Sequence, residues 1–349
     1  MKLNDLKYLS ALTVPLSAVI GLYLKGYWLF VTPIFIFVFI PILELVLKED
    51  NTVFSESEKA TRSIHPIFDW LLYLNLPIIY ALLIWALLEV SRYGFETYEF
   101  VGLVLSVGIV LGGNGINVAH ELGHRQASKV RFIGKALLLP SLYMHFYIEH
   151  NFGHHLNAAT KEDPATARYK QSVYSFWITS TFRQYFSAWK IQMQLINTYK
   201  LSFLSIRNDM FWYTILQISY LIIVFAVFGK IALLFAILTA VTAFLLLETV
   251  NYIEHYGLLR TKKSSGRYER VSEIHSWNSN HVIGRILLYE LTRHSDHHYR
   301  TTKKYQVLEC LDESPQLPYG YPTSMVLTMF PPLWFAIMNK RVPHEMISA

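Results

Sequence analysis

Long apolar runs alternate with shorter polar segments along the chain, and the runs predict membrane helices. The clearest run covers residues 27–47 and holds neither lysine nor arginine. At about 1.5 Å per residue, a helix of that length crosses the roughly 30 Å hydrocarbon core of a bilayer. A short break at Gly229 and Lys230 separates the last two runs. The pattern predicts six spans, at residues 8–24, 27–47, 67–90, 100–119, 210–228 and 231–247.

Composition agrees with a membrane protein. Hydrophobic residues make up 53% of the 349 residues and charged residues 16%, whereas soluble domains carry about a quarter charged residues. The apolar content excludes disorder, and a soluble fold would have to hide six such helices in one core. The single cysteine, Cys310, excludes an internal disulfide, a thiolate zinc site and a cysteine-ligated iron–sulfur cluster. We expect an all-α integral membrane protein, with residues 1–349 as one membrane domain.

Basic residues predict the orientation of the spans. Of the 31 Lys and Arg residues, 28 lie in four segments, 1–8, 48–66, 120–209 and 258–349. Because basic loops stay in the cytoplasm, we expect both termini and the large loops on that side. The first run lacks a small-residue cleavage site, so we expect a retained helix rather than a signal peptide. Residues 132–148 contain Lys135, Pro140 and His145, and we expect them to be interfacial or re-entrant rather than a seventh span.

Nine of the 14 histidines fall in four short motifs. Residues three or four apart share one face of a helix, so we expect each motif to present its imidazoles to one point. All four motifs lie at span ends or loops that face the same side of the membrane. They are His120 and His124 in HELGH, His150, His154 and His155 in HNFGHH, His255 in NYIEHYG, and His294, His297 and His298 in HSDHH.

Histidines grouped in this way predict a metal centre, and imidazole suits zinc, copper, iron or nickel. One zinc ion takes three or four protein ligands, which nine histidines exceed. Two ions would receive four and five histidines and keep positions open for O₂. We therefore expect two iron ions in a cytoplasmic cap formed by residues 120–209 and 252–349, with copper and manganese as open alternatives. Five histidines are not expected to be ligands: His65, His145, His275, His281 and His344.

Acidic residues within the motifs are candidates for supporting roles. Metal-bound histidines usually donate their second N–H to a carboxylate or a carbonyl. We expect such contacts from Glu121, Glu149, Glu254 and Asp296, and the sequence leaves open whether a carboxylate bridges the metals. Helix-end charges or surface ion pairs are the alternative interpretation of each.

The four motifs, read as HELGH, IEHNFGHH, NYIEHYGLLR and HSWNSNH followed by RHSDHH, resemble those of the membrane alkane 1-monooxygenases. The likeness extends over residues 99–321 and includes DPAT at 163–166. Three histidine clusters alone would indicate only the wider desaturase and hydroxylase superfamily, and the motif with His255 is the specific one. The sequence departs from the usual family residues at three positions outside the predicted ligands, Arg125, Arg285 and Thr292.

The resemblance implies a fold, a cofactor and a reaction. The fold is a six-helix domain in the bacterial inner (plasma) membrane, with two non-haem iron ions bound by the nine histidines at the cytoplasmic helix ends. The reaction is hydroxylation of the terminal methyl group of an n-alkane, using O₂, two electrons and two protons to give a 1-alkanol and water. An alkane has no polar group, so chain length must be selected by shape. We expect side chains of residues 30–40 to set that limit.

Electrons must come from another protein. The glycines of residues 112–115 lie inside a predicted span, where they favour helix packing over nucleotide binding, and one cysteine cannot build a rubredoxin site. The resemblance implies rubredoxin and an NAD(P)H-dependent rubredoxin reductase as donors, and the basic loops suit an acidic carrier. The expected partners are these proteins, the n-alkane and the lipid bilayer, with no nucleic acid.

Other functions remain open at this level. A fatty-acid desaturase or hydroxylase, or an aromatic side-chain or terpene hydroxylase, would share the metals and the topology. An intramembrane zinc protease would use HELGH with Glu121 as general base, but would leave the remaining clustered histidines unexplained. A metal transporter would place polar residues across the membrane rather than at one end.

Overall fold

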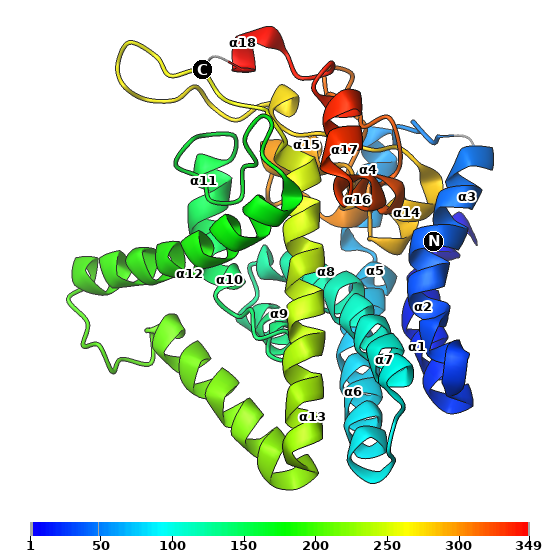
Figure 1. Ribbon diagram of the computed structural model, residues 1–349. Coiled ribbons are helices and arrows are strands. Elements are labelled where there is room, and N and C mark those ends of the chain that lie inside the picture. Colours follow the sequence, from blue (N-terminus) through cyan, green and yellow to red (C-terminus); the bar gives the residue numbers. More distant parts are fainter. Residues whose placement is uncertain (1–2, 48, 348–349) are drawn as a thin grey trace.

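The computed structural model describes residues 3–47 and 49–347, and most of them are helical (Figure 1). Among these residues the only β-pairing consists of two isolated bridges, Lys262 with Tyr268 and Asn278 with Gln316. The prediction of an all-α protein is therefore confirmed.

A helical hairpin opens the fold. Its two arms meet at a tight turn, where Lys25 (φ 58°) and Gly26 (φ 56°) are left-handed, a conformation that glycine adopts without steric cost. The first arm contains η1 (Leu3–Leu12) and α1 (Thr13–Leu24), and the second contains η2 (Gly26–Phe30), α2 (Val31–Ile34), the π-helix η3 (Phe35–Phe39) and α3 (Ile40–Val46).

A second hairpin carries the first histidine motif. Its return arm is a continuous run of helix whose π-helical middle holds the predicted glycine segment. A Cβ at Gly112 would lie 3.2 Å from the backbone oxygen of Ala243, so close helix packing is confirmed there, whereas a Cβ at Gly113 would meet nothing within 4 Å. The elements are α4 (Glu56–Ile64), α5 (Pro66–Tyr73), α6 (Asn75–Arg92), α7 (Thr97–Val110), η4 (Leu111–Ile116) and α8 (Asn117–Gly123).

Short helices follow and carry the second motif. Residues 132–148 are divided between two of them, which excludes a continuous span there. Helix α12 (Val173–Thr198), which the sequence pattern did not predict, extends away from the bundle in Figure 1 and is capped by the Ser172 side chain. The short elements are α9 (Ser128–Leu138), α10 (Phe146–Glu149), the π-helix η5 (His150–His154) and α11 (His155–Asn157).

The longest helical segment, α13 (Asp209–His255), contains 47 residues. At about 1.5 Å per residue this is more than twice the thickness of a bilayer core. Its backbone is non-helical at Gly229 (φ 84°, ψ −177°), and Figure 1 shows its two arms forming a V. The predicted break at Gly229 is therefore present, and His255 is the last residue of the second arm.

The remaining residues form a cap over one end of the helices, at the top of Figure 1. It consists of loops and short helices that cover the end of α13 and the end of α3. These helices are η6 (Glu273–His275), α14 (Val282–Leu287), α15 (His294–Tyr299), η7 (Tyr305–Val307), α16 (Tyr321–Thr328), α17 (Pro331–Met338) and α18 (His344–Ile347).

Five helical segments of the described chain are long and apolar enough to cross a membrane. They cover all six predicted runs except for residue 47. The last two runs both lie in α13, so the number of crossings and their direction stay predictions. The segments are Asp5–Leu24, Gly26–Val46, Pro66–Arg92, Thr97–Gly123 and Asp209–His255.

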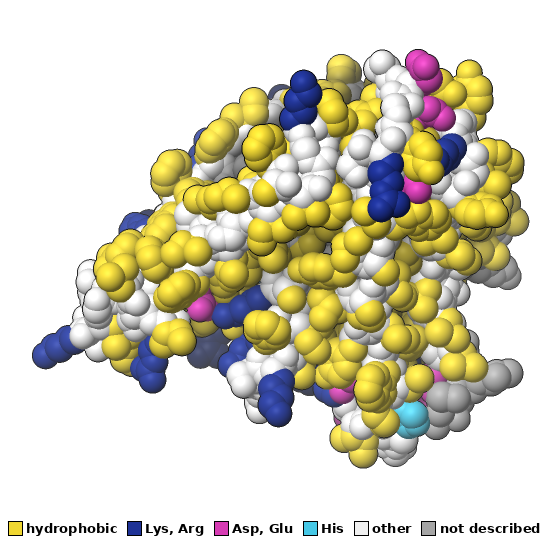
Figure 2. All heavy atoms as spheres, turned by 90° about the horizontal axis from the view of Figure 1, so that it is seen from below, with side chains coloured by type: hydrophobic (Ala, Val, Ile, Leu, Met, Phe, Trp, Pro, Cys, Tyr) yellow, Lys and Arg dark blue, Asp and Glu magenta, His cyan; other side chains and the backbone are white. Residues whose placement is uncertain are grey.

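Apolar side chains cover the outside of these helices. On the first arm of α13, Ile218, Ile222 and Val227 are 53%, 61% and 66% exposed. Seen from the end opposite the cap, hydrophobic side chains occupy most of the surface (Figure 2). Soluble monomers rarely expose apolar areas of this extent, so this surface belongs in lipid.

Candidate metal centre

The nine predicted histidines converge where the helices meet the cap. They form two groups, and within each group one ring nitrogen per histidine lies within 4.8 Å of the others. The groups are neighbours, since the ring centroids of His155 and His298 are 4.7 Å apart. The five-histidine group contains His120, His124, His150, His155 and His297, and the four-histidine group contains His154, His255, His294 and His298.

The prediction that each motif presents its imidazoles to one point is wrong for two motifs. His150 and His155 belong to the five-histidine group while His154 belongs to the other, and His297 is likewise separated from its motif. Consecutive residues of a helix point about 100° apart, so neighbours such as 154 and 155 face different points. The π-helix η5 brings residues five apart into register, which pairs His150 with His155.

Ring-nitrogen spacing in the five-histidine group fits a bound cation. The Nε2 atoms of His124, His150 and His155 form a triangle with sides of 3.2, 3.3 and 2.9 Å. One imidazole nitrogen has a single in-plane proton or lone pair, so hydrogen bonds cannot satisfy all three sides. Two nitrogens bound at about 2.1 Å to one ion would be roughly 3.0–3.4 Å apart, as here.

Orphaned nitrogens support the same assignment. Nε2 of His120 and of His297 are buried and have no hydrogen-bond partner among the described residues. In the four-histidine group, Nε2 of His298 lies 3.2 Å from that of His154 and 2.9 Å from that of His294. The side chains present therefore fit two metal ions, one in each group.

Burial holds three histidines outside the helical spans neutral, namely His124, His150 and His297. Burial, with a smaller effect of Arg125, lowers the pKa of His124 to about 4. Burial also lowers the pKa of His150 and His297 well below the usual range for imidazole. Neutral imidazole is the form that binds metals.

Glu254 is the predicted carboxylate that faces the histidines most directly. Its Oε2 lies 3.3 Å from Nε2 of His294, and its Oε1 accepts a hydrogen bond of 3.0 Å from the Tyr321 hydroxyl. Nε2 is the nitrogen of His294 that faces the other histidines of its group. Glu254 therefore contacts the metal-facing side of the ring and not the opposite nitrogen, Nδ1.

Asp163 is a supporting carboxylate that was not among the four predicted from the sequence. Its Oδ2 lies 3.0 Å from Nδ1 of His154, the ring nitrogen opposite the one in the four-histidine group. The Thr166 hydroxyl donates to the same oxygen. Burial opposes ionisation, but His154 and Thr166 hold the pKa of Asp163 below its usual range. The DPAT sequence at 163–166, which is part of the family resemblance, pointed to this segment but did not indicate a role for Asp163.

Replacing Asp163 with Asn should weaken metal binding in the four-histidine group. The change removes the charge beside His154 and keeps the size, and loss of such a partner typically costs about 10–100-fold in affinity. Iron content after dialysis against graded chelator measures this. Glu162→Gln, on the exposed neighbouring residue, is the matched control. Equal retention by the two variants would contradict the role of Asp163.

The other three predicted carboxylates bind different groups. Glu121 contacts Arg125 and accepts the N–H of Tyr305, and Asp296 contacts Lys303 and accepts the N–H of Glu309. Glu149 has a long contact of 3.4 Å from the Ser187 hydroxyl. All three anchor the histidine-bearing helices to neighbouring segments.

The five histidines excluded as ligands lie outside both groups. His145 packs between Tyr143 and Tyr185. His275 contacts Glu269, and His281 contacts the Ser279 hydroxyl.

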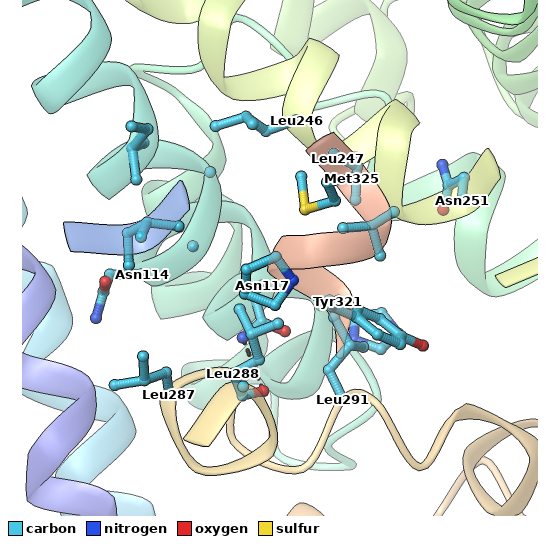
Figure 3. A pocket seen from close by; sticks show the side chains of 18 of the residues that line it. Asn114, Asn117, Leu246, Leu247, Asn251, Leu287, Leu288, Leu291, Tyr321 and Met325 are labelled. Atoms are coloured by element: carbon cyan, nitrogen blue, oxygen red, sulfur yellow. Dashed lines mark hydrogen bonds between the residues drawn. The ribbon is translucent and has the colours of Figure 1, made fainter. Parts of the chain in front are cut away.

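An apolar cavity of about 90 Å³ leads from the helices to the histidines. Leu246, Leu247 and Met325 line one side, and Leu287, Leu288 and Leu291 line the opposite side (Figure 3). Ile36 and Phe37 also line it, from the 30–40 segment. Its polar end is formed by His120, His150, His294 and Glu254. We call it the apolar cavity.

Comparisons with known proteins bear on this arrangement. A family model described as fatty acid desaturase matches residues 97–326. The chain is 37% identical over 319 residues to alkane 1-monooxygenase 2 of Pseudomonas aeruginosa. The aligned residues cover 90% of this chain and 84% of that protein. The chain belongs to the alkane 1-monooxygenase family. Alkane 1-monooxygenase 1 of Alcanivorax borkumensis is also 37% identical, over 333 residues that cover 94% of this chain and 82% of that one.

Family membership identifies the chain as an enzyme and excludes the zinc protease. HELGH is one part of a larger histidine set, and Glu121 contacts Arg125 rather than facing a lone metal. The xylene/toluene monooxygenase hydroxylase component XylM of Pseudomonas putida is more distant, at 29% identity over 352 residues, or 97% of this chain and 89% of that one.

Proposed function

We propose that this alkane 1-monooxygenase hydroxylates the terminal methyl group of medium- and long-chain n-alkanes, using O₂ and electrons from rubredoxin. The observation that carries the proposal is the apolar cavity, because it ends at histidines of both groups. Only a narrow apolar cavity that ends at a metal centre brings the end of an unfunctionalised chain to the reactive position.

The residues of the cavity bind and orient the alkane. Each methylene buried there contributes about 0.8 kcal/mol, so Leu246, Leu288 and Met325 hold the chain by contact area alone. The same side chains keep bulk water from the histidines. Two iron ions bound by the nine histidines would supply the two-electron reduction of O₂ that a monooxygenase requires. Glu254, at the edge of the cavity, lies beside the Nε2 atom of His294 that faces the other histidines, so it is placed to contact an ion held by the four-histidine group.

The proposed topology has six crossings, with both termini and the metal centre in the cytoplasm. Its support is the break at Gly229 and the concentration of Lys and Arg in the segments on the histidine side. A bacterial inner membrane satisfies this orientation and gives alkanes dissolved in the bilayer direct access to the helices.

Electrons are proposed to enter from a soluble carrier. Rubredoxin, reduced by an NAD(P)H-dependent reductase, is the proposed donor, and the basic histidine side of the molecule would attract an acidic carrier. Activity with rubredoxin should fall as ionic strength rises from about 0.01 to 0.15 M, because screening shortens the Debye length from about 30 to 8 Å. An unchanged rate would remove the electrostatic part of the proposal.

One purified sample tests the function. Iron, zinc and copper are quantified, and octane, O₂, NADH, rubredoxin and its reductase are supplied, with toluene in a parallel reaction. We expect about two irons per chain and 1-octanol as the product. Two irons per chain with benzyl alcohol but no octanol as product would show that the substrate is an alkyl side chain of an aromatic compound and not an n-alkane. One zinc without O₂ consumption would overturn the monooxygenase proposal.

A further inference from the structure

The turn between the cavity wall and His294 has an unusual backbone. Tyr289 (φ 50°) and Glu290 (φ 61°) are consecutive non-glycine residues in the left-handed region. Residues with a Cβ adopt this conformation at a steric cost and keep it only where their surroundings enforce it. Leu287 and Leu288, on one side of the turn, line the apolar cavity, and His294 follows on the other.

A buried carboxylate holds this turn. Glu290 is 2% exposed. Its Oε1 accepts a hydrogen bond of 2.6 Å from the Tyr8 hydroxyl, and its Oε2 lies 2.6 Å from Nε of Arg285. Nε of Arg293, the residue before His294, lies 3.7 Å from the same oxygen. One side chain therefore connects the first helix, α14 and the start of α15.

The two arginines that contact Glu290 are also paired with Asp50. Arg285 is 1% exposed and contacts the Asp50 carboxylate at 2.7 Å. Arg285 and Arg293 both donate to the backbone oxygen of Asp50. Buried charges are tolerated only when paired in this way, so removing the Glu290 charge leaves the two guanidinium groups without the carboxylate that they share.

Two amides on the membrane helices contact the same turn, one at its backbone and one at a side chain. Nδ2 of Asn117 donates to the backbone oxygen of Leu288 at 3.0 Å, and the two residues lie beside each other in Figure 3. Nδ2 of Asn75 lies 3.2 Å from the Tyr289 hydroxyl. The turn is thus fixed to the same helices that form the cavity.

We propose that Glu290 is a positioning residue that fixes the distance between the cavity wall and the four-histidine group. Leu287, Leu288 and Leu291 align the alkane, and His294 belongs to that group, so the turn between them decides which carbon faces the histidines. This inference rests on the proposed function. Relaxing the turn would let the chain slide and expose the second carbon.

Two variants test this role. Glu290→Gln removes the charge, and Tyr8→Phe removes only the hydroxyl that donates to it, so it preserves the charge balance. Loss of a hydrogen bond to a charged group changes a conformational equilibrium constant by about tenfold or more. We expect the ratio of 2-octanol to 1-octanol to rise about tenfold in Tyr8→Phe and further in Glu290→Gln, which loses the charge as well. Iron should also be lost to a chelator faster in both, in the same order.

Glu99→Gln is the matched control. Glu99 accepts the N–H of Gly26 at the opposite helix ends and does not line the apolar cavity, so the product ratio and iron loss of this variant should equal those of the wild type.

Unchanged product ratio and iron loss in both test variants would overturn the inference, even if Glu290→Gln lowered the Tm, because the role would then be only structural. If Glu290→Gln does not fold, Tyr8→Phe decides. Absence of any octanol from the wild type would refute the proposed function, while iron loss would still test Glu290.

Discussion

Replacing His150 with Ala should abolish alkane hydroxylation and reduce the iron content. Its Nε2 lies 3.2 Å from that of His124 and 2.9 Å from that of His155, and the ring also lines the apolar cavity. Changes in groups that support a metal ligand lower metal affinity or activity by about 10–100-fold. Loss of a ligand should therefore lower activity by more than about 100-fold. The bound iron should fall from about two ions per chain towards one. Turnover of octane and metal analysis of the same sample measure both effects.

A matched histidine gives the control for this experiment. His344 is exposed in the C-terminal helix α18 and belongs to neither histidine group. His344→Ala should therefore retain both iron ions and full activity. If His150→Ala kept two ions and normal turnover, the five-histidine group would not be a metal site. If both variants lost iron equally, the loss would reflect a general instability of the protein.

Replacing Gly113 with Leu should shorten the longest alkane that the enzyme accepts. Gly113 lines the apolar cavity, a Cβ there would meet no atom within 4 Å, and its helical backbone accepts a side chain. The new side chain would occupy space that otherwise holds substrate. Each methylene displaced costs about 0.8 kcal/mol, or roughly fourfold. We expect kcat/KM for dodecane to fall more than about tenfold, and that for octane to fall less.

Product analysis over a series from hexane to hexadecane measures this shift. Gly94→Leu is the control, because that glycine also has no neighbouring atom within 4 Å but does not line the cavity. The reciprocal variant, Phe37→Ala, enlarges the cavity and should extend the profile to longer chains. An equal fall for all chain lengths in Gly113→Leu would contradict control by cavity length and indicate damage to the helix.

The sequence was sufficient for the features that depend on local spacing. The apolar runs were long enough to predict every helix that can cross a membrane, because span length follows directly from helix rise. The break at Gly229 and the nine clustered histidines were also visible in the sequence. Glu254 was predicted to lie beside the ligands, since it is adjacent to His255.

The division of the histidines between two groups depends on three-dimensional structure. The i, i+4 rule alone suggested that His150, His154 and His155 share one point, but the π-helix η5 rotates them between two. The spacing of residues in this short motif does not by itself predict a π-helix. Asp163 was missed for a related reason: it meets His154 only because the chain folds back nine residues later.

By itself, therefore, the sequence determined the membrane class, the histidine inventory and the resemblance to a family, all of which depend on residue type and spacing along the chain. Only the tertiary structure decided which histidines share a metal site, that Ile36 and Phe37 face the apolar cavity, and that Glu290 connects Tyr8 with Arg285. Tyr8 and Glu290 are separated by 282 positions. Contacts over such separations arise from the packing of whole helices, which no local pattern encodes.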